Sequence, residues 1–310
     1  DEAQDLTPLQ WKQVAILKER ASRVYYAGDD DQCIHRWNGV NLHSFMNACD
    51  NKTVLNKSYR VPSSVYKLAN QLVNRINVRQ KKDWQPRDED GNVDFHMNWY
   101  DVNIDEGSWT IMARTNKALN SIHHSLREDG YLFERFGHSM ISLELLEAMS
   151  IWERLAKGET ASVGEIKKLY GFMPKQGDRA LLKRAATKTF DAVDPQGYHN
   201  YDNLVAEHGL LVNQDARPEV VVNMSLEDIR YMGAVRRRGE DLTKPRINLS
   251  TIHRMKGGED DNVLLLTDSS YPAVNAPDQD DEHRVFYTAV TRARNNLHIV
   301  DSHAKYRYTI

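Results

Sequence analysis

Trp109-Thr110-Ile111-Met112-Ala113 has the composition of a buried β-strand. The sequence predicts a helix next, from Asn116 to about Asp129, with Gly130 as its C-terminal stop. A second strand is predicted over residues 131–136. This order of strand, helix and strand is typical of a parallel sheet, so the predicted fold class is α/β.

The same pattern resumes near the other end of the sequence. Residues 247–251 and 263–266 are predicted strands, a helix is expected over residues 280–293, and residues 297–300 are predicted to form the last strand. Between the two α/β segments, residues 142–241 show helical spacing and no clear strand, which predicts an inserted helical subdomain with a basic helix over residues 180–188. Its candidate phosphate contacts, on what is more often a solvated face, are Lys183, Arg184, Lys188 and Arg236-Arg237-Arg238.

A domain boundary is predicted near Tyr59. Pro62 opens a predicted helix whose apolar face is formed by Val65, Leu68, Ala69, Leu72 and Ile76. A strand is predicted over residues 93–97, and before the boundary two more are predicted over residues 23–27 and 53–55, with a short helix between them. The predicted domains are the end of a first domain over 1–58, a second domain over 59–141 and 242–310, and the helical insert over 142–241.

Composition narrows the class of protein. The 310 residues suffice for two or more cores, and the formal net charge is −3, so nucleic acid is expected to bind in a local groove with stacking side chains. Only two cysteines, Cys33 and Cys49, are present, which favours a reducing compartment over a disulfide framework. No apolar run has membrane-spanning length and no signal peptide is visible, so we expect a cytoplasmic protein of prokaryotic or viral origin, or a nuclear one in a eukaryote.

Two polar stretches are candidate ligand sites. Gly28-Asp29-Asp30-Asp31-Gln32 follows a predicted strand, and strand ends in open α/β sheets bind ligands. A glutamine there can hydrogen-bond a terminal phosphate, and Trp37 is either a core residue or a platform on which bases stack. The acidic cluster Asp1-Glu2-Ala3-Gln4-Asp5 is solvated charge unless a nucleotide site lies beside it.

Five motifs, read in order, carry a specific resemblance. They are Asp1-Glu2-Ala3-Gln4-Asp5, residues 28–40 (GDDDQCIHRWNGV), residues 55–60 (LNKSYR), residues 249–259 (LSTIHRMKGGE) and residues 286–294 (FYTAVTRAR). In this order they resemble the motifs of the superfamily 1 DNA helicases of the UvrD/Rep/PcrA type. The resemblance implies RecA-like parallel-sheet motor domains of the P-loop NTPase type with an inserted helical subdomain. It also implies an ATP-dependent DNA helicase or translocase, an ATP hydrolase that moves 3′ to 5′ along single-stranded DNA and unwinds duplex DNA.

The resemblance also implies roles for individual residues. Asp1 would hold Mg²⁺, Glu2 would activate the attacking water, and Gln32 would sense the γ-phosphate of ATP. Arginine fingers would be Arg60 and Arg292, while Tyr59 would stack on adenine and Glu259 would bind the ribose. The implied DNA contacts are Trp37, His35, Thr251, His253 and Arg114.

Several positions depart from the family pattern. His35 stands where the family usually has tyrosine, and Asn38 where it usually has arginine, which bears on how the single strand is gripped. Gly258 replaces a leucine and Asp260 an aromatic residue, so looser packing is expected behind Glu259. Lys256 and Tyr287 are expected to support the motifs rather than to contact a ligand.

No phosphate loop of the form G-x-x-x-x-G-K-[ST] occurs in the sequence. We therefore expect the chain to be the C-terminal part of a larger helicase and to be deficient in ATP hydrolysis by itself. Alternatives are the motor part of a RecB/AddA-like helicase–nuclease and a non-catalytic module that binds single-stranded nucleic acid. The sequence does not decide whether the nucleic acid is DNA or RNA, nor which partner loads the motor. The expected pathways are DNA repair and DNA replication.

Overall fold

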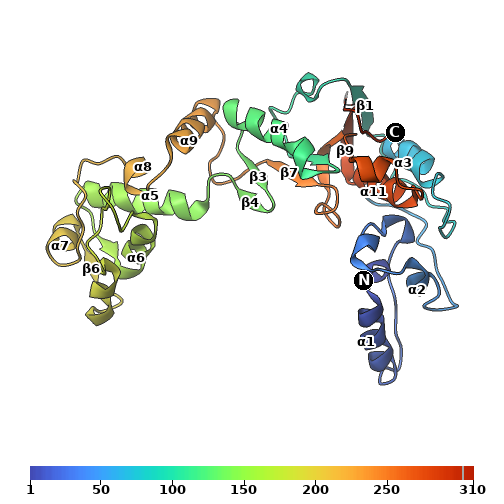
Figure 1. Ribbon diagram of the computed structural model, residues 1–310, viewed down its shortest axis with the longest axis horizontal. Coiled ribbons are helices and arrows are strands. Elements are labelled where there is room, and N and C mark those ends of the chain that lie inside the picture. The colour runs from blue at the N-terminus through green and yellow to red at the C-terminus, as the bar shows by residue number, and fades with distance from the viewer. Residues whose placement is uncertain (302–303) are drawn as a thin grey trace. The chain divides into compact units, whose positions relative to one another are not determined.

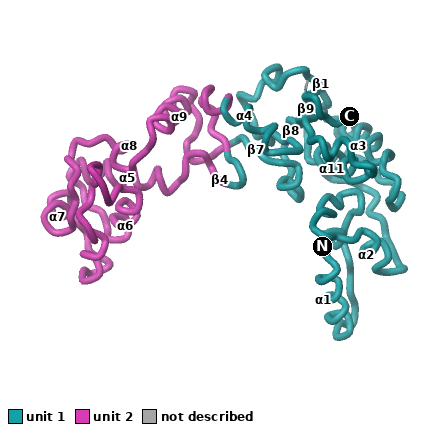
Figure 2. Tube along the Cα trace, in the orientation of Figure 1, with its two compact units in different colours: residues 1–124, 134–137, 246–310 teal, residues 125–133, 138–245 magenta. Residues whose placement is uncertain are grey.

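The computed structural model describes residues 1–301 and 304–310. The chain divides into two compact units, one of residues 1–124, 134–137 and 246–310 and the other of residues 125–133 and 138–245 (Figure 2). The division passes through helix α4 (Asn116–Glu128) and strand β3 (Phe133–Arg135). Among the described residues, no helix combines the length and the apolar character that a membrane crossing needs.

A parallel sheet forms the centre of the first unit. Its strands are β1 (Asn92–His96), β9 (Ala293–Val300), β8 (Asp260–Leu266), β2 (Trp109–Ala113) and β7 (Ile247–Thr251), each hydrogen-bonded in parallel to the next in this order. The order continues with β3 and β4 (His138–Ser139). This mostly parallel sheet confirms the predicted α/β fold class.

The predicted strand bounds are largely confirmed. Strands β2 and β7 have the predicted bounds, and Ile111 pairs with Leu249 in their register. Strands β1 and β8 overlap the predicted strands, whereas β9 begins at Ala293, four residues before the predicted start at 297. It begins early because helix α11 (Asp280–Val290) ends before Thr291, three residues short of the predicted end.

Two amphipathic helices cover one face of this sheet. Helix α3 (Ser63–Val73) buries Val65, Leu68, Ala69 and Leu72 as predicted, with Pro62 as its N-cap, and it packs beside α11 (Figure 1). Their core includes Met112, Leu297 and Ile299 of the strands. The unit also contains helix α10 (Tyr271–Val274) and the 3₁₀ turn η4 (Trp99–Asp101).

The N-terminal segment contains short helical elements. They are η1 (Ala3–Asp5), α1 (Pro8–Lys18), η2 (Asp30–Gln32), η3 (Arg36–Asn38) and α2 (Leu42–Met46). The strands predicted over residues 23–27 and 53–55 are wrong: neither segment forms a strand in the described structure, and Tyr25 and Leu55 are exposed. A strand exists only where a neighbour supplies ladder hydrogen bonds, which residue composition does not report.

The second unit is mainly helical. Its elements are α5 (Leu143–Ala156), α6 (Val163–Phe172), η5 (Ala186–Ala192), α7 (Tyr201–Ala206), α8 (Pro218–Val221) and α9 (Leu226–Arg238). A two-stranded antiparallel ladder joins β5 (Ala161–Ser162) to β6 (Tyr198–His199). The helix predicted over residues 180–188 is wrong, because Leu182 forms a bridge with Leu210 and Ala185 has a positive φ of 62°, which interrupts a right-handed helix.

Gly130 has the predicted role after α4. Its φ is +75°, and a Cβ there would lie 2.6 Å from the backbone carbon of Ala234. Both the left-handed conformation and the close approach of α9 therefore require glycine.

Candidate functional site

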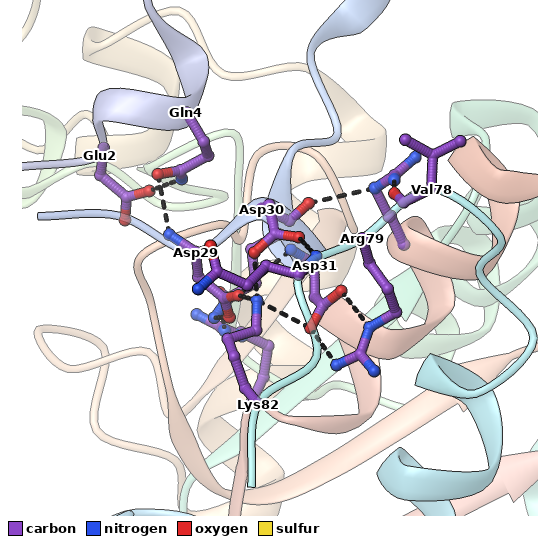
Figure 3. Close-up of polar contacts among 12 residues, drawn as sticks. Glu2, Gln4, Asp29, Asp30, Asp31, Val78, Arg79 and Lys82 are labelled. Atoms are coloured by element: carbon purple, nitrogen blue, oxygen red, sulfur yellow. Dashed lines mark hydrogen bonds and ion pairs between the residues drawn. The ribbon is translucent and has the colours of Figure 1, made fainter. Parts of the chain in front are cut away.

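The acidic loop is held against the N-terminal motif through Gly28. A Cβ on Gly28 would lie 2.3 Å from Oε1 of Gln4, so only glycine permits this approach. The Gln4 side chain is 1% exposed; its Oε1 accepts from the Asp29 amide at 3.1 Å, and its Nε2 donates to the Glu2 carboxylate (Figure 3). The sulfur of Cys33 donates to the Gln4 carbonyl at 3.3 Å, and burial raises the pKa of this thiol to about 11.

Three consecutive carboxylates of this loop pair with two cations that lie some 50 residues later in the chain. Lys82 Nζ contacts Asp29 at 2.6 Å and Asp31 at 2.9 Å and also pairs with Asp30 (Figure 3). Arg79 donates to both oxygens of Asp31, at 2.8 and 2.7 Å. Burial alone would raise the pKa of Asp29, but Lys82 outweighs burial and lowers it. The cluster is therefore a structural ion network with its own cations, not an open cation site.

Gln32 is oriented by one partner on each side. Its Nε2 donates to Asp29 at 2.8 Å, and its Oε1 accepts from Arg292 at 2.7 Å, so the two partners fix which way the amide points. Arg292 is 2% exposed and also donates to the carbonyls of Thr288 and Gly258. Burial and the nearby Arg60 lower the pKa of Arg292 to about 10, which still leaves the guanidinium charged at neutral pH.

Glu2 pairs with a lysine of the fourth motif. Lys256 Nζ lies 3.3 Å from Oε2 of Glu2 and also pairs with Asp5. Burial raises the pKa of Glu2, but Lys256 and Gln4 outweigh it and lower the pKa below its usual value. Glu2 has a left-handed φ of 52°, and its amide donates to the exposed Asp1 carboxylate at 2.8 Å.

The predicted nucleotide contacts around Arg60 lie together. Arg60 Nη1 lies 3.4 Å from Glu259, which also pairs with Arg294 at 3.4 Å. Tyr59 is 87% exposed, so its ring is open to a stacking partner. A cavity of about 510 Å³ is lined by Gln32, Arg60 and Lys82 together with parts of the N-terminal segment.

The predicted DNA contacts are brought together only in part. Trp37 is 76% exposed on η3, and the His35 ring lies 6.3 Å from it and 5.9 Å from the His253 ring. Burial, Arg114 and His35 lower the pKa of His253 to about 4, so this ring is neutral at pH 7. An open groove of about 610 Å³ beside Trp37 is lined by Asp5, Thr7, Leu9, Gln10, Gln13, His35 and Asn38.

The two other predicted DNA contacts lie near the end of the central strands. Thr251 is the last residue of β7, and Arg114 directly follows β2. Arg114 donates to both oxygens of Glu282, with distances of 2.7–3.0 Å, so its guanidinium is occupied by a carboxylate.

Sequence reasoning missed several residues that build the site. Arg79 and Lys82 pair with the aspartates of the loop, and Arg284, which is fully buried, donates to the Asp30 carbonyl at 3.1 Å. The one signal in the sequence was the row of three aspartates, since buried carboxylates require cations. The three aspartates do not identify which of the 41 lysines and arginines pair with them.

Family comparisons agree with the motif order. Residues 1–53 match the UvrD/REP helicase N-terminal domain, and residues 164–304 match the UvrD-like helicase C-terminal domain.

Individual relatives are distant. The chain is 20% identical to a probable DNA helicase II homolog of Mycoplasma pneumoniae, an alignment that covers 97% of this chain and 53% of that protein. It is 32% identical to the ATP-dependent DNA helicase PcrA of Bacillus subtilis over 47% of this chain and 20% of that protein. It is 34% identical to DNA helicase II of Escherichia coli over 27% of this chain and 12% of that protein. The chain thus spans about half the length of the first of these relatives and less of the others.

Proposed function

Because the chain contains UvrD/Rep/PcrA-like helicase domains, we propose that it is part of the motor of an ATP-dependent DNA helicase. One observation carries this proposal: the loop of residues 28–38 contributes Gln32 to one cavity and Trp37 to another. The first cavity is the proposed ATP site, and the groove beside Trp37 is the proposed single-strand site. Only a few residues of backbone separate Gln32 from Trp37, so a shift of Gln32 can be transmitted to Trp37 through this loop.

The proposed chemistry is transfer of the γ-phosphoryl group of ATP to water. Glu2 orients the water and takes its proton, and Arg60 and Arg292 donate to the phosphate oxygens whose charge grows in the transition state. Asp1 is the proposed magnesium ligand, because an exposed carboxylate is the hard oxygen donor that Mg²⁺ prefers. Mg²⁺ held by Asp1 would supply positive charge to the phosphate oxygens.

Several of these side chains are already paired within the protein. Arg292 donates to Gln32, Arg60 pairs with Glu259, and Lys256 pairs with Glu2. We propose that ATP binding breaks these three contacts. Phosphate oxygens then replace the Gln32 and Glu259 side chains on the two guanidinium groups. Release of Lys256 from Glu2 raises the pKa of the carboxylate and makes it a better base.

On the DNA side, Trp37 is the proposed stacking platform, with His35, Thr251, His253 and Arg114 as further contacts. The exposed indole supports this role, and His253 is neutral at pH 7, so it contributes hydrogen bonding rather than charge. Arg114 contacts phosphate only after leaving Glu282. Movement 3′ to 5′ and roles in DNA repair or replication are proposals from the family alone.

The 310 residues contain no phosphate loop, so we propose that they bind triphosphate weakly and turn over ATP slowly by themselves. The same observation favours a second candidate function, a module that binds single-stranded nucleic acid without catalysis. The two are distinguished by whether the full-length gene product hydrolyses ATP.

The experiment compares ATP hydrolysis by the full-length gene product and by these 310 residues, with and without single-stranded DNA. The motor proposal predicts DNA-stimulated turnover in the full-length protein and a loss of at least about 100-fold in Glu2→Gln, the scale of general base catalysis. A full-length protein that binds single strands but never hydrolyses ATP would favour the binding module.

The DNA side is tested by the affinity for a fluorescent oligothymidylate. Trp37→Ala is expected to weaken binding by roughly 5- to 150-fold, because stacking one base on an aromatic ring contributes about 1–3 kcal/mol. Trp37→Phe keeps a ring and is the matched control. Equal affinities of wild type and Trp37→Ala would exclude Trp37 as the platform.

A further inference from the structure

A cluster of three metal-ligating side chains lies away from both cavities, on the edge of the sheet. It consists of Asp94 and His96 of β1 and His298 of β9, whose ligand atoms all lie within 4.8 Å of one another. None of the three belongs to the five helicase motifs, and none lines either cavity.

The register of the two strands creates this cluster. Asp94 pairs with His298 in the parallel ladder, and His96 lies two residues further along β1. Side chains alternate between the two faces of a strand, so all three project from the same face. Leu297 and Ile299, the neighbours of His298 in β9, face the opposite way into the core beneath α3 and α11. The cluster therefore lies on the face that these two helices leave open.

The nitrogen atoms already face each other. His96 Nε2 lies 3.0 Å from His298 Nδ1, and an oxygen of Asp94 lies 3.8 Å from the same Nδ1. Two nitrogens bound tetrahedrally at about 2.0–2.1 Å from one zinc ion lie about 3.3 Å apart. The two imidazole nitrogens would thus need to separate by only about 0.3 Å, and a rotation of the half-exposed Asp94 side chain would bring its carboxylate to the same ion.

Neighbouring residues hold the donors in place. The His298 ring lies 5.3 Å from the ring of Trp109, which is 4% exposed and donates its indole N–H to the Glu106 carbonyl at 2.7 Å. Asn92 donates to the Asp94 carboxylate. The Asp94 side chain is 45% exposed and the His298 side chain 17%, so the cluster has a solvated entrance and a covered floor. Supporting contacts of this kind fix ligand orientation in metal sites.

We propose that Asp94, His96 and His298 form a binding site for a divalent transition-metal ion of the zinc class, which clips the edge strand β1 to β9. Two imidazole nitrogens and one carboxylate oxygen suit Zn²⁺ and Co²⁺ better than Mg²⁺ or Ca²⁺, which take oxygen ligands. Three protein ligands leave the fourth position to water. This site is separate from the proposed ATP chemistry and does not depend on it.

The test is a titration of the 310-residue chain, without nucleotide or Mg²⁺, with Co²⁺ as a spectroscopic probe and Zn²⁺ as competitor. We expect one Co²⁺ per chain with the visible d–d absorption of a tetrahedral ion, displaced by one equivalent of Zn²⁺. His96→Gln and His298→Gln should each lower the affinity at least about tenfold. His43→Gln, which changes an exposed histidine outside the cluster, is the matched control and should bind as wild type does.

The wild-type titration decides the proposal even if a histidine variant fails to fold. Absence of tetrahedral d–d absorption at one equivalent of Co²⁺ overturns it, and so does unchanged absorption in His298→Gln. Asp94→Asn, at the exposed end of the cluster, is a milder variant, and a retained Co²⁺ affinity there would remove Asp94 from the ligand set.

Discussion

At the scale of single residues, the site depends on one close approach. Gln4 fits against the loop because Gly28 has no side chain. The resulting hydrogen bonds run from Glu2 to Gln4, then to Asp29, Gln32 and Arg292. They connect the proposed catalytic base to one proposed arginine finger.

Gly28→Ala should break this connection. The new Cβ would overlap Oε1 of Gln4 at 2.3 Å and touch the Phe45 ring at 3.0 Å, so Gln4 must leave the Asp29 amide. Loss of a buried hydrogen bond costs about 1–3 kcal/mol, and amide hydrogen exchange in residues 28–33 should accelerate at least about fivefold. Mass spectrometry of exchanged peptides measures this.

Gly164→Ala is the matched control. Gly164 lies in α6 with no atom within 4 Å of a built Cβ, so alanine there should leave exchange in residues 28–33 unchanged. Equal exchange of this loop in wild type and Gly28→Ala would show that the contact with Gln4 is not needed.

Lys82→Met should be strongly destabilising. It leaves the carboxylates of Asp30 and Asp31, whose side chains are 5% and 1% exposed, without their shared cation. Removing one partner of a buried ion network costs about 3–5 kcal/mol, although Arg79 still pairs with Asp31 and reduces the loss. Urea unfolding followed by tryptophan fluorescence gives the free energy of unfolding.

The comparison for Lys82 is Lys57→Met. Lys57 pairs with Asp88, whose side chain is 94% exposed, so this change should cost less than about 1 kcal/mol. Similar losses in both variants would contradict the structural role given to Lys82.

The sequence predicted some of the side chains at the site, but not which residues they hydrogen-bond or pair with. The motifs singled out Gln32 and Arg292, which the structure joins by one hydrogen bond across 260 residues of sequence. Lys82 stands in a polar stretch like many others in this chain. Its role depends on a turn of the chain that brings it back to Asp29, and no local pattern encodes that turn.

At the scale of elements, prediction succeeded where burial alone sets the pattern. Strands β2 and β7 lie in the interior of a parallel sheet, and the predicted bounds are correct for both. The strand predicted over residues 23–27 is wrong, because this segment has the composition of a strand but no neighbouring strand to pair with among the described residues. The helix predicted over residues 180–188 is wrong because Leu182 forms a bridge instead.

Helix α11 is tied to the segment that follows α3 by one carboxylate in its first turn. Asp280 is 1% exposed and accepts the backbone amides of Asn77 and Val78, each at 2.9 Å. Burial raises its pKa, but these amide donors outweigh burial and lower it. A carboxyl whose pKa is lowered by folding stabilises the fold above its unfolded pKa of about 3.9, and this contribution is lost as pH falls through the folded value.

Asp280→Asn should therefore reduce the free energy of unfolding at pH 7 by about 1–3 kcal/mol. The difference between wild type and variant should shrink toward pH 3, because the wild-type carboxyl is then becoming protonated. Urea unfolding at both pH values measures the two differences. A difference that is constant with pH would show that the charge of Asp280 does not act through these amides.

At the scale of the whole molecule, the division into 1–58, 59–141 with 242–310, and 142–241 remains a proposal. The two compact units separate residues 125–133 and 138–245 from the rest, so all of the proposed insert lies within one unit. The motif order alone led to the helicase family, because the five motifs are spread over nearly the whole chain while the fold class is common to many functions.

We propose that Gln32 couples ATP hydrolysis to DNA binding. The measurement is ATP turnover by the full-length gene product at saturating single-stranded DNA, together with DNA affinity in the absence of nucleotide, for wild type and Gln32→Ala. In Gln32→Ala we expect DNA-stimulated turnover to fall at least about tenfold, equivalent to about 1.4 kcal/mol, with DNA affinity nearly unchanged because Trp37 is intact. Wild-type stimulation of turnover in Gln32→Ala would contradict it.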